Sequence, residues 1–234
     1  MDGIKANNGR ILVTPVAGGA TYTTQNGGSI NEPFVYAYLG VNPSNGKLLF
    51  EDINGNPTEN PIGADRKASG KNFIPQYQGG FGFDLDYKGF FVSSSFTFAQ
   101  KVWRIDGDLA NLYDPGNINT FTVTGELLNS WTPSNPNSNL PSLTASNAGA
   151  GSDSDRFLRD ASYVRLRNFQ IGYRVPRKYL DRTFFKDVSF TLQGENLITF
   201  TKWQGFDVES NRFNNDVYQY PTPKIYTFGM DLKF

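Results

Sequence analysis

The chain has 234 residues, and its 22 basic and 22 acidic side chains give a formal net charge of zero. It contains no His and no Cys, which excludes disulfides, thiolate metal sites and the Ser-His and Cys-His arrangements of nucleophilic catalysis. The sequence also lacks a basic stripe for nucleic acid and a run of about 18 apolar residues for a transmembrane helix.

Residues 1–78 are predicted to be mostly loop, because turn motifs interrupt the sequence and little periodicity is present. Asn42–Gly46 and Asn54–Pro57 are strong turn signals. A strand is predicted to end at Ile11–Val13, and a short hairpin is predicted through Lys47–Phe50. A segment of this length with so little periodicity is usually functional or disordered.

Residues 79–102 carry the clearest hairpin signal. In a two-residue hairpin, the residues that flank the turn are paired and face the same side. A turn at Lys88-Gly89 therefore places two apolar rows on one face of the hairpin. The predicted pairs are Tyr87 with Phe90, Leu85 with Val92, Phe83 with Ser94 and Phe81 with Phe96.

Residues 103–160 are predicted to be a second long polar loop, and residues 161–234 are predicted to hold three strands. The first of these, Tyr163–Val175, changes its alternation near Arg167-Asn168, which predicts a β-bulge. A short helical turn is expected within Arg177–Lys186, before a strand that begins near Val188 and runs to about Phe200.

The final strand runs from Ile225 to Phe234. Successive strand side chains point to opposite faces, so one face of this strand is wholly apolar and the other is polar or small. A length of about ten residues suits a tilted strand that crosses a bilayer. This strand is typical of the closing strand of an outer-membrane barrel, and we expect its apolar row to face lipid and to support barrel assembly. The row contains Tyr226, Phe228, Met230, Leu232 and Phe234.

The predicted connections alternate between short and long, as they do in outer-membrane barrels with short periplasmic turns and long extracellular loops. The predicted fold class is therefore all-β, an antiparallel meander of transmembrane β-barrel strands with long extracellular loops. The alternation also predicts that Phe234 lies at the periplasmic rim and Ile225 near the outside.

The sequence resembles the C-terminal portion of SusC/RagA-type TonB-linked transporters of Bacteroidetes outer membranes. The resemblance covers about residues 30–234, and the ordered series of motifs is more specific than any single one. The matching segments are Pro75–Phe81, Tyr87–Phe90, Trp131–Pro133, Asn135-Pro136, Ala161–Asn168, Gly172-Tyr173, Pro176, Gly194–Leu197, Phe200–Trp203, Gly205–Asp207, Tyr220–Pro223 and Tyr226–Gly229.

The resemblance implies a barrel of roughly 22 strands with an N-terminal plug. It further implies location in the cell outer membrane and import of oligosaccharides or peptides driven by the TonB complex. A SusD-like surface lipoprotein would be the partner that covers the outer mouth. The plug, the TonB contact region and most strands are missing from this chain, so we expect it to be an incomplete barrel.

Four aromatic residues are candidates for contact with a ligand or a partner, because they fall in or beside the expected outer loops. They are Trp103, Trp131, Trp203 and Tyr218. Anchoring at the membrane interface or packing within the loops is the favoured explanation for each. Asp52, Asn54 and Asn56 alternate like calcium ligands, but Pro57 and Gly63 occupy positions where a calcium loop has Gly and Glu. A solvated turn is therefore favoured over a metal site.

No catalytic residue and no cofactor is predicted. Asp84 and Asp86 are two carboxylates close in sequence, as in a glycosidase. Their spacing on a strand that leads into a tight turn favours a solvated lumen face instead. The alternative to a transporter is a soluble carbohydrate-binding β-sandwich, which would also show alternation, aromatic residues and turns.

Overall fold

The computed structural model describes residues 10–13, 21–25, 32–209 and 220–234. The chain divides into two compact units. The sheet unit comprises residues 75–101, 161–203 and 220–234, and the loop unit comprises residues 1–74, 102–160 and 204–219. Among the described residues, no helix is long and apolar enough to cross a membrane.

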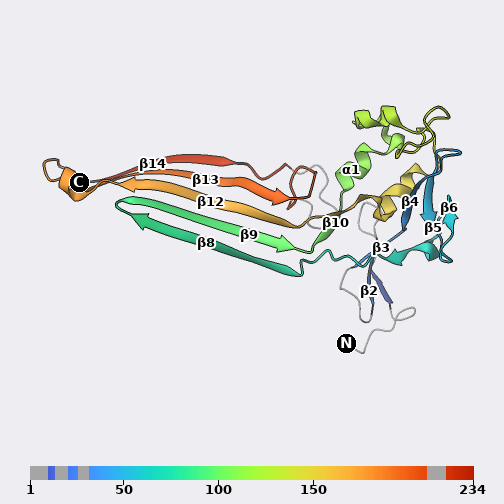
Figure 1. Ribbon diagram of the computed structural model, residues 1–234, viewed down its shortest axis with the longest axis horizontal. Coiled ribbons are helices and arrows are strands. Elements are labelled where there is room, and N and C mark those ends of the chain that lie inside the picture. Colours follow the sequence, from blue (N-terminus) through green and yellow to red (C-terminus); the bar gives the residue numbers. More distant parts are fainter. Residues whose placement is uncertain (1–9, 14–20, 26–31, 210–219) are drawn as a thin grey trace. The chain divides into compact units, whose positions relative to one another are not determined.

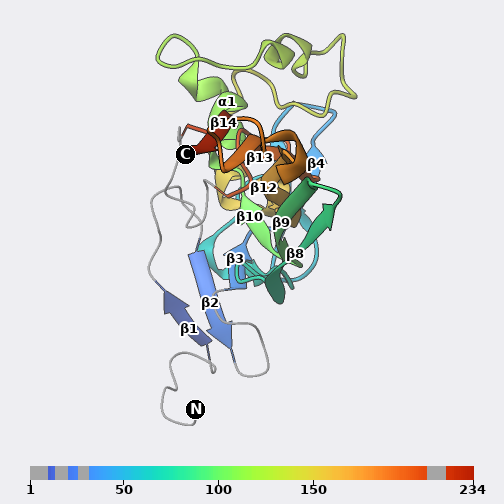
Figure 2. The ribbon, with the colours of Figure 1, turned by 90° about the vertical axis from the view of Figure 1, so that its left-hand side faces the viewer.

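The sheet unit is a single antiparallel sheet of five strands in the order β14-β13-β12-β9-β8 (Figure 1). Figure 2 looks nearly along these strands and shows them in that sequence. In the described part of the chain the sheet is open, with β8 and β14 at its two edges. The strands are β8 (Tyr77–Tyr87), β9 (Phe90–Gln100), β12 (Tyr163–Arg174), β13 (Asp187–Thr201) and β14 (Ile225–Lys233).

The hairpin β8–β9 has the predicted register. Tyr87 pairs with Phe90, and the pairing continues without interruption to Tyr77 and Gln100. Both turn residues have positive φ, 51° at Lys88 and 92° at Gly89, as the favoured two-residue turn requires. A Cβ at Gly89 would lie only 2.6 Å from the carbonyl oxygen of Arg174, at the end of β12. The close approach of β12 is therefore a second reason for glycine at this position.

The predicted bulge is confirmed at Arg167. Leu166 pairs with Phe96 and Asn168 with Ser95, which leaves Arg167 as the extra residue of β12 relative to β9. Strand β13 also has an extra residue relative to β12 at this level. Because both strands shift, the apolar side chains before and after the bulge remain on the same face of the sheet.

The described residues of the loop unit form three small antiparallel sheets, ordered β1-β2-β3-β7, β4-β5-β6 and β10-β11. Strands β4 and β5 form the short hairpin that the sequence predicts around Lys47–Phe50. The strands are β1 (Arg10–Val13), β2 (Thr21–Gln25), β3 (Glu32–Val35), β4 (Tyr38–Val41), β5 (Leu48–Glu51), β6 (Pro57-Thr58), β7 (Lys67-Ala68), β10 (Trp103–Ile105) and β11 (Leu158–Asp160).

Helices in the described residues are short, and all but one of them belong to the loop unit. The α-helix is α1 (Gly107–Leu112), and the 3-10 helices of this unit are η1 (Gly63–Asp65), η2 (Pro115–Asn117), η3 (Gly125–Asn129), η4 (Ala148–Asp153) and η5 (Asp155–Phe157). The remaining one, η6 (Arg177–Tyr179), is the short helical turn predicted between β12 and β13.

Two apolar clusters lie in the core of the described part of the loop unit. Val35, Ile105, Ala110 and Phe157 form one cluster, and Tyr36, Leu48 and Phe50 form the other. The first cluster joins side chains from distant segments, and Ala150 packs against the second cluster from the distant segment around residue 150. The segments around residues 32–68 and 103–160 are therefore more regularly folded than predicted, because strands of two to five residues are too short to give a periodic signal.

Asp106 begins helix α1 from a buried position. Its side chain accepts a hydrogen bond of 3.0 Å from the Leu109 backbone N–H, and the residue is 2% exposed. Burial raises the pKa of the Asp106 carboxyl above its usual range, although the Leu109 N–H and the charge of Arg159 oppose this effect. A raised folded-state pKa stabilises the fold at low pH, and that stability is lost as pH rises through the folded pKa.

We expect Asp106→Ala to lower the free energy of local opening at α1 by about 1 kcal/mol, because it removes the cap. Asp106→Asn keeps an oxygen acceptor and should be nearly neutral at pH 7. Hydrogen exchange at the Leu109 amide, corrected for intrinsic rates, measures both effects. In the wild-type chain protection should rise as pH falls through the raised folded-state pKa of Asp106 toward the usual range of an aspartate carboxyl, and in Asp106→Asn this dependence should be weaker. An unchanged pH dependence in the Asn variant would contradict this assignment.

Candidate functional site

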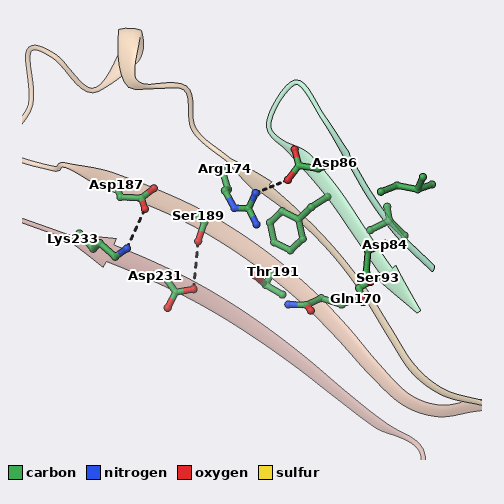
Figure 3. Close-up of a pocket in the computed structure, with 13 residues that line it drawn as sticks. Asp84, Asp86, Ser93, Gln170, Arg174, Asp187, Ser189, Thr191, Asp231 and Lys233 are labelled. Carbon is green, nitrogen blue, oxygen red and sulfur yellow. Dashed lines mark hydrogen bonds and ion pairs between the residues drawn. The ribbon is translucent and has the colours of Figure 1, made fainter. Parts of the chain in front are cut away.

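The polar face of the five-stranded sheet carries a hollow near the end with the short turns. Its volume is about 660 Å³, and it is shown in Figure 3. Strands β8, β9, β12, β13 and β14 all contribute to its lining. The charged and polar lining residues are Asp84, Asp86, Ser93, Gln170, Arg174, Asp187, Ser189, Thr191, Asp231 and Lys233.

Cross-strand pairs hold the two cations of this hollow. Arg174 Nη1 lies 2.5 Å from Asp86 Oδ2, and its guanidinium carbon lies 4.6 Å from the centre of the Phe91 ring. Lys233 Nζ lies 3.4 Å from Asp187 Oδ2. Asp86 is therefore half of an ion pair between strands, which fits the predicted solvated lumen face better than a pair of catalytic carboxylates.

The opposite face of the sheet is apolar and exposed. Leu85, Val92, Ile171, Leu192 and Phe228 are aligned across all five strands in one row. Within this row Leu85 is 62% exposed and Phe228 is 70% exposed. Met230 and Leu232 continue the β14 side of this face, at 53% and 37% exposure. We call this surface the apolar face.

Phe234 lies one residue beyond β14, with 67% of its surface exposed. Its ring stacks on Phe184, with 5.9 Å between ring centres and an angle of 3° between ring planes. Phe185 is also in contact, with 5.3 Å between ring centres. The terminal aromatic thus packs against the turn between β12 and β13. The sequence pattern identified Phe234 but gave no signal for Phe184 and Phe185, because they lie outside the alternating strands.

The tryptophans of the loop unit are held within it. Trp131 donates a hydrogen bond of 3.0 Å from Nε1 to the Pro43 carbonyl oxygen. The Trp103 ring lies 4.1 Å from Lys71 Nζ. Both rings are partly buried. These contacts support the packing that the sequence analysis favours, and each ring keeps some surface for a ligand.

Trp203 belongs to the sheet unit and is 8% exposed. Its backbone N–H donates to Thr201 Oγ1 at 3.0 Å, just after β13. Tyr218 lies outside the described residues. The four aromatic candidates therefore do not form a single described site, and their contact with a ligand or partner stays a prediction.

The sequence of Asp52, Asn54 and Asn56 folds as a turn closed by its own backbone. Asp52 Oδ1 accepts hydrogen bonds of 2.8 Å from the backbone N–H groups of Asn54 and Asn56. These bonds lower the pKa of Asp52, with the Asn56 N–H making the largest contribution. Among the described residues, no group of three or more acidic side chains is arranged to hold a metal ion. The turn explains these residue types without a cation.

Comparison with known proteins connects this geometry to a family. No family model matches the chain. TonB-dependent receptor P3 of Formosa agariphila is 31% identical over 217 residues, which are 87% of this chain and 20% of that receptor. TonB-dependent receptor P39 of the same organism is 27% identical over 201 residues, with 81% and 19% of the two chains covered.

Among solved structures, that of the RagAB peptide transporter matches with a TM-score of 0.80 and 24% sequence identity, covering 97% of this chain and 25% of that chain. The sequence similarity to TonB-dependent receptors and the fold shared with part of the RagAB transporter support assignment of this chain to the SusC/RagA type. The chain spans about a fifth of the length of the curated relatives it matches. The all-β fold class is confirmed, with an open antiparallel meander as part of a TonB-dependent β-barrel.

Two distant segments of the loop unit are joined by an ion pair that the sequence pattern did not predict. Arg66 Nη2 lies 2.7 Å from Asp153 Oδ2, and the Arg66 guanidinium carbon lies 4.5 Å from the centre of the Tyr36 ring. Partial burial raises the pKa of the Asp153 carboxyl, and the charge of Arg66 opposes that rise. Arg66 and Asp153 are 87 positions apart, so no local pattern could have paired them.

We expect Gly46→Ala to loosen the Trp131 anchor. Gly46 has φ +74°, and a Cβ there would lie 2.5 Å from Cε3 of the Trp131 ring. Backbone strain and this clash should lower the local opening free energy by about 1–3 kcal/mol. Hydrogen exchange at the Trp131 amide, which donates to the Leu140 carbonyl, measures the change.

Gly63→Ala is the matched control for this test. Nothing lies within 4 Å of a Cβ at Gly63. Its effect should stay within about 0.5 kcal/mol. Equal loss of protection in both variants would show that Trp131 is not anchored at the Gly46 turn.

Proposed function

We propose that this chain supplies five neighbouring strands and outer-side loops to the barrel of a TonB-dependent importer in the cell outer membrane. One observation carries the proposal: the apolar face is continuous across five paired strands and is left exposed. Leu85, Leu192 and Phe228 belong to one apolar row across the sheet, and each is more than half exposed, including Leu192 on the inner strand β13. A surface of this kind is stable when lipid covers it.

The dimensions of the sheet support this assignment. Strands β8 and β9 have 11 residues each and β12 has 12, which suits tilted strands around an apolar band about 25 Å tall. Tyr87, Phe90, Tyr173, Phe190 and Met230 form a largely aromatic row at the short-turn end. Aromatic girdles of this kind mark the interfaces of outer-membrane barrels.

The connections give the sheet its direction in the membrane. The two short turns, at Lys88-Gly89 and between β12 and β13, lie at the same end of the sheet (Figure 1). The long segments after β9 and β13 leave from the opposite end. We therefore assign the short-turn end to the periplasm and the loop unit to the outer side, and the polar face with its hollow to the lumen.

Within this proposal the activity is gated passage of a large nutrient, an oligosaccharide or a peptide, without bond chemistry by this chain. The likeness to a peptide transporter supports the peptide class, while exposed parts of Trp103 and Trp131 suit either ligand. A SusD-like surface lipoprotein and the TonB complex are the proposed partners of the whole receptor, and no cofactor is required.

The alternative, a soluble carbohydrate-binding β-sandwich, predicts a second sheet packed on the apolar side chains. The exposure of Phe83, Leu192 and Phe228 argues against it, because a sandwich buries such a row. The polar hollow on the other face is also difficult to reconcile with a sandwich core.

We expect Leu192→Arg to impair membrane assembly of a full-length receptor that carries this chain. An arginine on the lipid face costs up to about 2–4 kcal/mol, and the cost falls from the bilayer midplane towards the interface. The matched control is Gln193→Arg, one residue further along β13, which places the same charge on the polar face. Heat-modifiable migration of outer-membrane fractions reports assembly. Similar loss in both variants, or in neither, would contradict the assignment of the two faces.

Deletion of Phe234 should also reduce assembly of that receptor, because it removes the ring that stacks on Phe184 at the end of β14. In a soluble sandwich the same deletion should be nearly harmless. The yield of folded receptor in outer-membrane fractions, compared with that of Phe234→Tyr, measures the effect. Normal assembly after the deletion would count against a role for this residue.

A further inference from the structure

The turn between β12 and β13 combines exposed aromatic rings with exposed cations. Its sequence from 182 to 186 is Arg-Thr-Phe-Phe-Lys. Phe184 is 71% exposed, although it stacks on Phe234. Arg177, Arg182 and Lys186 are exposed as well. We call these cations and the rings of Phe184 and Phe234 the basic rim.

The basic rim has a defined conformation. Thr183 Oγ1 donates to the Leu180 carbonyl oxygen at 2.8 Å, and the Phe185 N–H donates to Thr183 Oγ1 at 3.3 Å. The Lys186 N–H donates to the Lys233 carbonyl oxygen at 2.7 Å, which ties the turn to the end of β14. The cations are therefore presented on a fixed turn beside the final strand.

In the described part of the chain, the cations of the basic rim lack the acidic partners that the cations of the hollow have. Arg174 and Lys233 are paired with Asp86 and Asp187 across strands. Among the residues that the structure describes, Arg177, Arg182 and Lys186 have no acidic partner within 4.0 Å. Between Pro176 and Lys186 the sequence contains four basic residues and a single acid, Asp181. The turn thus carries net positive charge that the described residues do not neutralise.

The basic rim continues the apolar face. Leu232 is the last apolar residue of β14 on that face, and Phe234 follows two residues later with its ring against Phe184. In a membrane barrel, the end of the apolar band is the level of the lipid headgroups, where aromatic rings and extended Lys and Arg side chains are both favoured. The unpaired cations therefore lie where the acyl chains end and the phosphates begin.

We propose that the basic rim binds the headgroups of anionic phospholipids in the membrane leaflet at the short-turn end. The guanidinium of Arg182 and the ammonium of Lys186 would contact headgroup phosphates, while Phe184 and Phe234 insert between the adjoining acyl chains. This inference rests on the proposed function, because it requires that the apolar face be covered by lipid. The inference goes beyond that function, because the basic rim would favour anionic over neutral lipids. Burial of the apolar face alone would not distinguish the two.

The test uses a full-length receptor that carries this chain, purified in neutral detergent and titrated with phosphatidylglycerol or with phosphatidylcholine. Native mass spectrometry counts bound lipids and gives apparent affinities. A cation near an anionic surface contributes about 1 kcal/mol, which corresponds to about 5-fold in affinity. Arg182→Gln with Lys186→Gln should therefore weaken phosphatidylglycerol binding by about 10-fold or more and leave phosphatidylcholine binding unchanged.

Lys101→Gln with Lys224→Gln is the matched control. Both lysines are exposed and belong to the sheet unit, just after β9 and just before β14, at the end of the sheet opposite to the basic rim. Loss of phosphatidylglycerol affinity in the rim variant alone supports the proposal. Equal loss in the two variants, or no loss in either, overturns it.

The failure of this inference and the failure of the proposed function give different results. If the rim variant assembles in phosphatidylcholine bilayers with unchanged phosphatidylglycerol affinity, the preference for anionic lipid is wrong and the importer assignment stands. If the unmodified receptor does not insert into bilayers of either lipid, the importer assignment itself fails. Arg182→Lys, which keeps the charge, should retain most of the phosphatidylglycerol affinity.

Discussion

The register of strand pairing is the constraint on which the rest of this structure depends. Strand side chains alternate with a period of two, so a shift by one residue would exchange the apolar and polar faces of a strand. In the sheet unit the register aligns Leu85, Val92, Ile171, Leu192 and Phe228 across all five strands. The hollow and its ion pairs on the other face follow from the same alignment.

The paired bulges at Arg167 and beyond Glu195 preserve this alignment. Leu166 and Phe169 are three positions apart, yet both face the apolar side because Arg167 is an extra residue in β12. Strand β13 makes a compensating shift, where Asn196 adopts a φ of 52°. Arg167 Nη1 donates to Asn196 Oδ1 at 3.4 Å and Nε donates to Thr97 Oγ1 at 2.8 Å. A polar side chain thus links the two irregular strands where the backbone ladder is disturbed.

The sheet was predictable from sequence and the loop unit was not, for one physical reason. The strands of the sheet unit are long and alternate, so the hairpin register, the bulge and the apolar row of β14 can be read from neighbouring residues. The loop unit depends on contacts between distant segments instead. Asn147 accepts from the Leu48 N–H and donates to the Leu48 carbonyl, across 99 positions in the chain. Likewise, neighbouring residues do not predict the burial of Phe50 or the pairing of Arg66 with Asp153.

The candidate sites divide in the same way. The turn at Asp52 is a local feature, because an Asx turn needs only residues up to four positions away. The packing of Trp131 depends on Pro43 and Gly46, which are more than 80 positions upstream, so its spacing could not reveal that contact. Contacts of individual side chains could therefore be inferred from the sequence only where the partners are close in the chain. The fold class could be inferred without such contacts.

The sheet unit has two kinds of cation. Those in the hollow of the polar face are paired with carboxylates, and those of the basic rim have no such pairing among the described residues. On the polar face, cations are paired with carboxylates of other strands. Lys233 pairs with Asp187 on the adjacent strand, and Arg174 of β12 reaches across β9 to Asp86 of β8. Such exposed pairs contribute little to stability, about 0–1 kcal/mol each. At the basic rim no neighbouring strand supplies a carboxylate to Arg182 or Lys186. Where the sheet ends, the counter-charge has to come from outside the sheet unit, and the aromatic rings beside these cations indicate that it comes from lipid.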